Sequence, residues 1–247
     1  MKSQCPYHEG KLRDDLPPLT ERIGKLLVDE RGYPVPRFVQ WIAFKDSKTV
    51  TPYGVGYPEF RMASTEHLRD CIRDQLCWVC GEKLGRHRAY VIGPMCCINL
   101  VSAEPPSHVD CAEWSVRGCP FLAKPNMRRR EDDFTRAQDE PAGVMIKRNP
   151  KAIAIWVTTK PNKLFRAGDT GYLFQVPAPP DKLTFYSEGR LAIPKEILES
   201  IVTGLPALTS VAENVEEVKM IFDKANAFIA TLPEVQYLVN RLEAPRS

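Results

Sequence analysis

The sequence lacks long hydrophobic runs and any segment typical of export. Its longest uninterrupted apolar stretch, residues 152–157, is far shorter than the roughly 20 residues that cross a bilayer. The first residues, Met-Lys-Ser-Gln-Cys-Pro, contain no apolar core of the kind a secretory signal needs. We therefore expect a cytoplasmic protein with no membrane partner.

A strong charge excess and the common catalytic motifs are also missing. The chain carries 34 Lys and Arg against 31 Asp and Glu, and the resulting net charge of +3 neither requires nor excludes a nucleic-acid partner. G-x-G-x-x-G, Walker, H-E-x-x-H and G-x-S-x-G motifs do not occur, which argues against the common nucleotide-dependent enzymes and hydrolases. With 43% hydrophobic residues over 247 positions, the chain has enough apolar sequence to bury a core.

Cysteine is the residue type that is present in an unusual pattern. Seven of the 8 cysteines fall between Cys71 and Cys119. Disulfide scaffolds are usually short and secreted, whereas clustered cysteines in a cytosolic chain more often bind metal. The clustering therefore predicts a metal site.

Two half-sites define that metal site. Cys77-Trp-Val-Cys80-Gly81 is a CxxCG knuckle, in which the two-residue gap lets both sulfurs face one ion. His108 and Cys111 follow Ser107, which we expect to cap a helix with both ligands on its first turn. A knuckle, a hairpin formed by residues 89–92 with the segment after Met95, and this helix together resemble a treble-clef zinc finger. The ligands predicted for zinc are Cys77, Cys80, His108 and Cys111.

The other cysteines leave alternatives open. Cys96 or Cys97 could replace a ligand, because pleat alternation would send one of them toward the metal. Cys96 could also act as a nucleophile activated by His87 or by nearby arginines. Cys71 and Cys119 are predicted to be small buried side chains.

Composition divides the chain into five parts. Residues 1–63 form a mixed N-terminal region, 64–125 the zinc module, 126–143 a charged linker, 144–191 an antiparallel meander and 192–247 a helical tail. Ser64 is placed to cap a helix that leads to Cys77. Strands are expected at 37–44, 59–62, 89–92, 144–148, 152–158, 172–176 and 183–187. The fold class is therefore α+β: a treble-clef zinc module, a small antiparallel sheet and a C-terminal helical hairpin.

The helical tail contains a regular apolar pattern. Apolar residues from Leu208 to Leu232 are spaced alternately by three and four positions, as in a coiled-coil seam. One helix is expected to stop at Gly204 and a second to run over 206–232, followed by a helix over 234–242. The seam either packs on the protein's own sheet or makes a surface for a second copy or another protein.

A wider resemblance rests on several strings: Gly-Tyr-Pro-Val-Pro from residue 32, CWVCG, VIGPMC, SAEPPSH, Cys111-Ala-Glu and CPFL. With these the chain resembles a group of bacterial and phage proteins. The resemblance implies a bacterial or phage origin and carries no catalytic residue over to this sequence.

Nucleic acid is the partner that local charge favours. The expected contacts are basic residues near three tryptophans, Trp78, Trp114 and Trp156, whose rings could stack on bases. The candidates for these contacts are Arg86, Arg88, Arg128, Arg129, Arg130, Lys147 and Arg148.

The predicted function is a zinc-stabilised binding protein that acts on nucleic acid or on a complex that handles it. One alternative is a phage or bacterial protein-interaction factor, a host-factor inhibitor or adaptor, that uses the helical tail. Another is a divergent HNH-like nuclease, although the hairpin position reads Val91-Ile-Gly-Pro-Met95 and has no general base.

Overall fold

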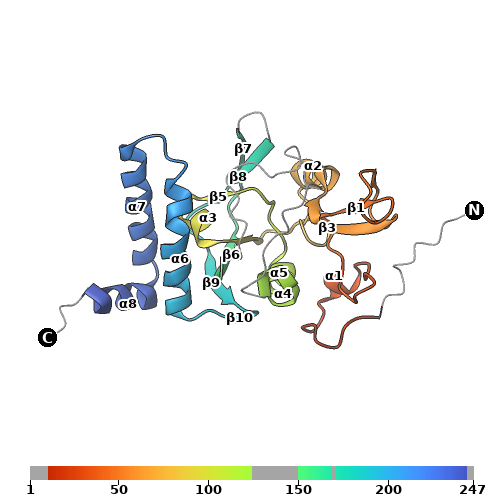
Figure 1. Cartoon of the computed structure of the whole chain (residues 1–247), viewed down its shortest axis with the longest axis horizontal. Helices are drawn as coiled ribbons and strands as arrows, with labels where there is room; N and C mark the ends of the chain where they lie inside the picture. The colour runs from red at the N-terminus through yellow and green to blue at the C-terminus, as the bar shows by residue number, and fades with distance from the viewer. Residues whose placement is uncertain (1–10, 124–149, 168–170, 244–247) are drawn as a thin grey trace, which may run out of the picture.

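The computed structural model describes residues 11–123, 150–167 and 171–243 of the chain. Over these residues the fold is a mixed α+β arrangement of three small antiparallel sheets and a group of C-terminal helices. Figure 1 shows the N-terminal sheet at one end, the C-terminal helices at the other and the central sheet between them. The α+β class predicted from sequence is confirmed. The predicted linker 126–143 and the run 144–148 lie outside the described residues.

The N-terminal sheet has the strand order β2-β1-β3, formed by Val50–Thr51, Val39–Ile42 and Tyr57–Ala63. Strands expected at 37–44 and 59–62 are therefore present. A short helix, α1 (Glu21–Gly24), precedes the sheet, and Thr20 caps it. The turn into β3 requires Gly56, because its φ is +85° and an added Cβ would lie 2.1 Å from the carbonyl oxygen of Ile42.

The central sheet has the order β10-β9-β6-β4. Its middle strand β6 (Ile153–Thr158) is buried at every position, so both of its edges need partner strands. One partner of β6 is β9 (Lys182–Ser187), whose other edge pairs with β10 (Arg190–Leu191). The other partner of β6 is β4 (Arg88–Ile92), which lies far upstream in the sequence. In the register of this sheet, Trp156 lies between Tyr90 and Leu183.

The prediction of a simple meander is wrong. The run at 172–176 forms β8 (Gly171–Gln175), which belongs to a third sheet of order β5-β8-β7. β7 (Lys163–Ala167) was not predicted as a strand, because four of its five residues are exposed and it has no apolar alternation. β5 (Val101–Ser102) completes the sheet.

The hairpin predicted after residue 92 is also wrong. The segment after Gly93 forms a helix, α3 (Pro94–Asn99), because Pro94 at the first helical position has no backbone donor to lose. β4 instead pairs with β6, and a single bridge joins Ala89 to Ser107. Cys96 and Cys97 consequently lie on a helix, not on a pleated strand.

Three helices form the C-terminal part, as expected, but with different bounds: α6 (Pro194–Thr209), α7 (Val215–Ala230) and α8 (Pro233–Glu243). α6 does not stop at Gly204. This glycine lies inside the helix where α6 packs closely on α3, and a Cβ there would lie 3.0 Å from Cγ of Met95. The continuous helix over 206–232 is wrong because Asn214 caps a new helix, its Oδ1 accepting from the Glu217 amide at 2.9 Å.

The largest core cluster joins the central sheet to these helices. Trp156 and Phe185 from the sheet, Ile201 from α6 and Phe228 from α7 are all buried in it. The rings of Phe185 and Phe228 pack edge to face, with centroids 6.4 Å apart. Among the residues described, no helix is long and apolar enough to cross a membrane.

Truncation of Phe228 tests this docking of α7. Phe228→Ala should lower the free energy of unfolding by about 3 kcal/mol, because it removes a buried ring and leaves a cavity. Phe222→Ala on the same helix is the control, since this ring is 46% exposed and should change stability by less than about 1 kcal/mol. Urea unfolding of both variants is the measurement, and equal losses would contradict the packing.

Candidate metal centre

The first half of the site is a tight loop between α2 (Thr65–Asp74) and β4. Ser64 caps α2 as predicted, its hydroxyl accepting from the amide of His67. Within the loop, the Cys77 amide donates to the Glu82 carbonyl at 2.8 Å and the Gly81 amide to the Cys77 carbonyl at 2.9 Å. Gly81 has a φ of +75°, a conformation that favours glycine. This backbone places Cys77 and Cys80 on the same side of the loop.

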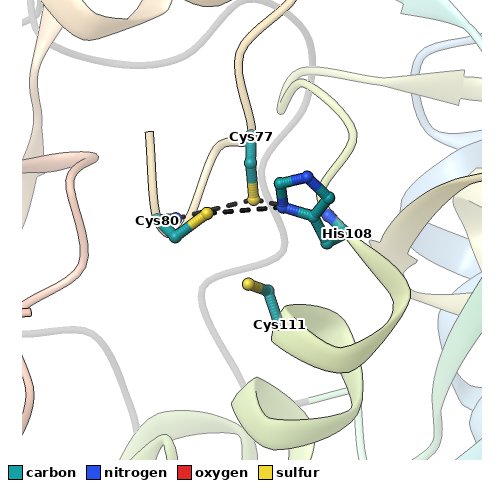
Figure 2. Close-up of side chains that lie close together, drawn as sticks. All are labelled: Cys77, Cys80, His108 and Cys111. Carbon is teal, nitrogen blue, oxygen red and sulfur yellow. Dashed lines mark hydrogen bonds between the residues drawn. The ribbon is translucent and has the colours of Figure 1, made fainter. Parts of the chain in front are cut away.

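The second half of the site is the start of α4 (Val109–Gly118), which is followed by α5 (Pro120–Ala123). Here the predicted cap is wrong: Ser107 exchanges two backbone hydrogen bonds of 2.8 Å with Ala89, and His108 is the N-cap residue. The imidazole of His108 and the sulfur of Cys111 still face the knuckle (Figure 2).

All four predicted ligands meet at one point (Figure 2). The ligand atoms of Cys77, Cys80, His108 and Cys111 lie within 4.8 Å of one another. Cys77 and Cys111 are fully buried, and Cys80 is half-buried. Over the described ranges this is the group of cysteine, histidine and acidic side chains that could hold a metal ion.

Hydrogen bonds around the group orient it for a cation. Nδ1 of His108 lies 3.3 Å from the Cys80 sulfur, and Nε2 lies 3.1 Å from the Lys83 carbonyl oxygen. Because a carbonyl only accepts, Nε2 carries the proton and Nδ1 presents its lone pair to the sulfurs. The backbone amides of His108 and Cys80 also point at the Cys77 sulfur, at 3.3 and 3.5 Å, as amides do around a thiolate.

The thiols of Cys77, Cys80 and Cys111 differ in pKa. Hydrogen bonds from the Cys111 and Cys80 thiols lower the pKa of Cys77, while the bond that Cys111 donates to Cys77 raises the pKa of Cys111. For Cys80, the hydrogen bond from Cys111 lowers the pKa. The hydrogen bond that Cys80 donates to Cys77 and the burial of Cys80 both raise the pKa, to about 12 overall. A cation that binds all three sulfurs as thiolates must displace the protons that the thiols carry.

Residues outside the predicted set support the site. The buried His67 places Nε2 3.3 and 3.2 Å from the carbonyl oxygens of Cys77 and Trp78, and its ring stacks on Trp78. Arg22 on α1 forms ion pairs with Glu82 in the knuckle at 3.2 Å and with Asp110 on α4 at 2.9 Å. Separations of 60 and 88 residues leave no sequence signal for these ion pairs.

The remaining cysteines do not join the group. Cys96 and Cys97, the predicted alternative ligands, lie on α3 and are not among the four grouped side chains. Burial raises the pKa of Cys96 to about 11 and that of Cys97 well above its usual range, which disfavours the thiolate that a nucleophile needs. Cys71 is buried as expected, with its sulfur 3.4 Å from Nε2 of His67. Cys119 is half-buried at the end of α4.

The predicted nucleic-acid contacts are only partly described. Arg86 is exposed, and Arg88 is half-buried and donates to the side chains of Gln75 and Asn162. The three tryptophans are core residues with at most 5% exposure, so the expectation that they stack on bases is wrong. The candidates outside the described residues are Arg128, Arg129, Arg130, Lys147 and Arg148.

Comparisons with protein-family models, curated proteins and solved structures found no match to this chain. The resemblance to bacterial and phage proteins therefore stays a prediction, and the class of site is defined by the cluster itself: a buried Cys3His group suited to a metal ion.

Removal of one ligand tests the cluster. Cys111→Ser should abolish stoichiometric metal binding and lower the melting temperature by several degrees, because the remaining sulfurs lose the shared cation. Cys97→Ser is the control, a buried thiol on α3 whose replacement should keep the metal. Native mass spectrometry and thermal unfolding are the measurements. Retention of the ion by Cys111→Ser would contradict the assignment.

Proposed function

We propose that this chain is a zinc-stabilised protein that binds nucleic acid. Three thiolates and one imidazole form the donor set that zinc takes in closed tetrahedral sites. The knuckle, the Ala89–Ser107 bridge and α4 follow one another as in a treble-clef finger, with α3 and β5 inserted between the two bridged positions. The module that we assign is therefore a treble clef with a reduced hairpin.

The proposed zinc has a structural role. A catalytic zinc keeps a coordination position open for water, whereas here four protein side chains converge on one point. Asn99, which a nuclease interpretation would use, accepts a hydrogen bond from the Val101 amide at 3.1 Å and helps to end α3. A binding role therefore has better support than the divergent nuclease.

The observation that carries the nucleic-acid proposal is a basic surface at one end of the central sheet. β4 begins with Arg88 at the end where β6 finishes and β9 begins, because the three strands run antiparallel to their neighbours. Lys182 opens β9, and Lys160 follows β6. We call the set Arg86, Arg88, Lys160, Lys163 and Lys182 the basic sheet end.

In the basic sheet end, the cationic side chains of Arg88 and Lys160 donate hydrogen bonds to uncharged oxygen atoms. Arg88 donates to the amide oxygens of Asn162 and Gln75, and Lys160 donates to the carbonyl oxygens of Ala178 and Pro179. Asp181 is the nearby acid. Hydrogen bonds from Thr159 lower its pKa, with a further contribution from the charges of Lys160 and His87. The neutral partners of Arg88 and Lys160 leave their charges uncompensated by those bonds, which suits the surface to phosphates.

Charge reversal on this surface tests the proposal. The Lys163→Glu, Lys182→Glu double variant should bind a fluorescent oligonucleotide at least about ten-fold more weakly than wild type at low salt, because two phosphate contacts become repulsive. Lys45→Glu, Lys48→Glu, two exposed lysines between β1 and β2, is the charge-matched control and should bind as wild type. Fluorescence anisotropy at several salt concentrations is the measurement. Absence of wild-type binding at low salt would refute the proposal.

A second candidate is self-association through α7. Val215 is 78% and Phe222 46% exposed, and with Val218 they share one side of the helix. Glu216 and Glu217 lie in the first turn of α7, whereas Lys219 and Lys224 lie farther along. Two copies of α7 packed antiparallel would therefore set acidic against basic residues and cover the apolar side.

Oligomeric state tests this candidate. Wild-type protein should sediment as a dimer at micromolar concentration and Phe222→Glu as a monomer, because the charge would be buried between the two helices. Ala227→Glu, exposed on another side of α7, is the control and should leave the dimer intact. A monomeric wild type at high concentration would refute self-association and leave α7 for another protein.

A further inference from the structure

The exposed face of the β7–β8 hairpin carries an unusual combination of side chains. Phe165 is 40% exposed although it lies on a strand, and it pairs directly with Leu173. Lys163 lies two residues before it, so both side chains are on the same face of β7. The opposite face carries Phe174, which is 2% exposed and belongs to the main core. One face of the hairpin is therefore anchored and the other presents an aromatic ring beside a lysine.

This face adjoins the basic sheet end. β7 begins directly after Asn162, whose side-chain oxygen accepts from Nη1 of Arg88 at 3.0 Å. Lys163 belongs to both surfaces. The ring of Phe165 is thus an exposed aromatic group next to a run of cations that includes Arg88 and Lys160, and backbone hydrogen bonds to β8 hold its strand in place.

We infer that Phe165, with Lys163 beside it, stacks on an unpaired base of single-stranded nucleic acid whose phosphates contact the basic sheet end. This inference rests on the proposed function and adds the class of ligand to it. A ring that stands on a surface can stack only on a base whose face is free, and the bases of a duplex present their edges and not their faces. The basic residues alone would bind either form, so the ring is what selects the single strand.

The geometry suits this role in two respects. The pairing of β7 with β8 fixes the backbone that carries the ring, which lowers the entropy cost of stacking. Lysine at i−2 on the same face lies about 7 Å along the strand, close to the spacing of successive phosphates in an extended single strand. The ring and the ammonium group can therefore contact one nucleotide and its neighbour.

The experiment compares Phe165→Ala with wild type on three labelled probes: oligothymidylate, oligouridylate and a DNA duplex of the same length. Phe165→Ala should bind oligothymidylate about ten-fold more weakly, with duplex binding changed less than about two-fold. Phe165→Tyr should bind as wild type because it keeps a ring. Phe44→Ala is the control for loss of an exposed phenylalanine outside the basic sheet end, since this ring is 65% exposed. The oligouridylate arm shows whether the ribose hydroxyl is accepted.

Each outcome separates the inference from the proposed function. If wild type binds none of the three probes, both fail. If wild type binds but Phe165→Ala binds oligothymidylate equally well, or weakens equally on the duplex, the stacking inference is overturned and the proposed function stands. Metal content and melting temperature of each variant are measured first, and Phe165→Leu replaces Phe165→Ala if the latter unfolds, with the same loss expected.

Discussion

The meeting of three cysteine sulfurs and one imidazole is the constraint on which the N-terminal half of the molecule depends. Cys77 and Cys111 are part of a core cluster that also contains Ile23 and Leu26 from the N-terminal region and Trp114 from α4. The cluster is small, and three buried sulfurs repel one another once they ionise. A zinc ion there would contribute about 10–16 kcal/mol, comparable with the roughly 5–15 kcal/mol that keeps a typical domain folded.

A few backbone hydrogen bonds connect this centre to the central sheet. The Trp78 amide donates to the Pro106 carbonyl, and the Ala89–Ser107 bridge connects the strand after the knuckle to the residue before His108. β4 then pairs along its whole length with β6, the most buried strand of the fold. Fixing the two half-sites therefore also fixes where β4 enters the sheet, and with it the position of Arg88.

This dependence connects the metal centre to the proposed binding surface. Arg88 occupies the first position of β4, and its partner Gln75 lies just after α2, at the entrance to the knuckle. The basic sheet end is thus built partly from residues that flank the knuckle. A structural ion can in this way govern a binding surface without contacting the ligand, because it determines which strand end the cations occupy.

The sequence by itself determined the local features. The CxxCG spacing and the three-residue step from His108 to Cys111 identified the four side chains that meet at one point, since both half-sites are made within a few residues of chain. Ser64 marked the start of α2, and the apolar run at 152–158 marked the central strand, because caps and burial patterns act over short distances. Five of the seven expected nucleic-acid contacts fell on residues that the structure does not describe.

Only the tertiary structure decided how distant segments meet. β4 pairs with a strand some 65 residues away, α3 replaces the expected hairpin, and Arg22 and His67 support the metal centre from elements that carry no metal-binding motif. The helical seam divided into α6 and α7 because Asn214 capped a new helix and Gly204 allowed α6 to pack on α3. Such pairings depend on the free energy of burying whole surfaces against each other, and no short stretch of sequence contains that information.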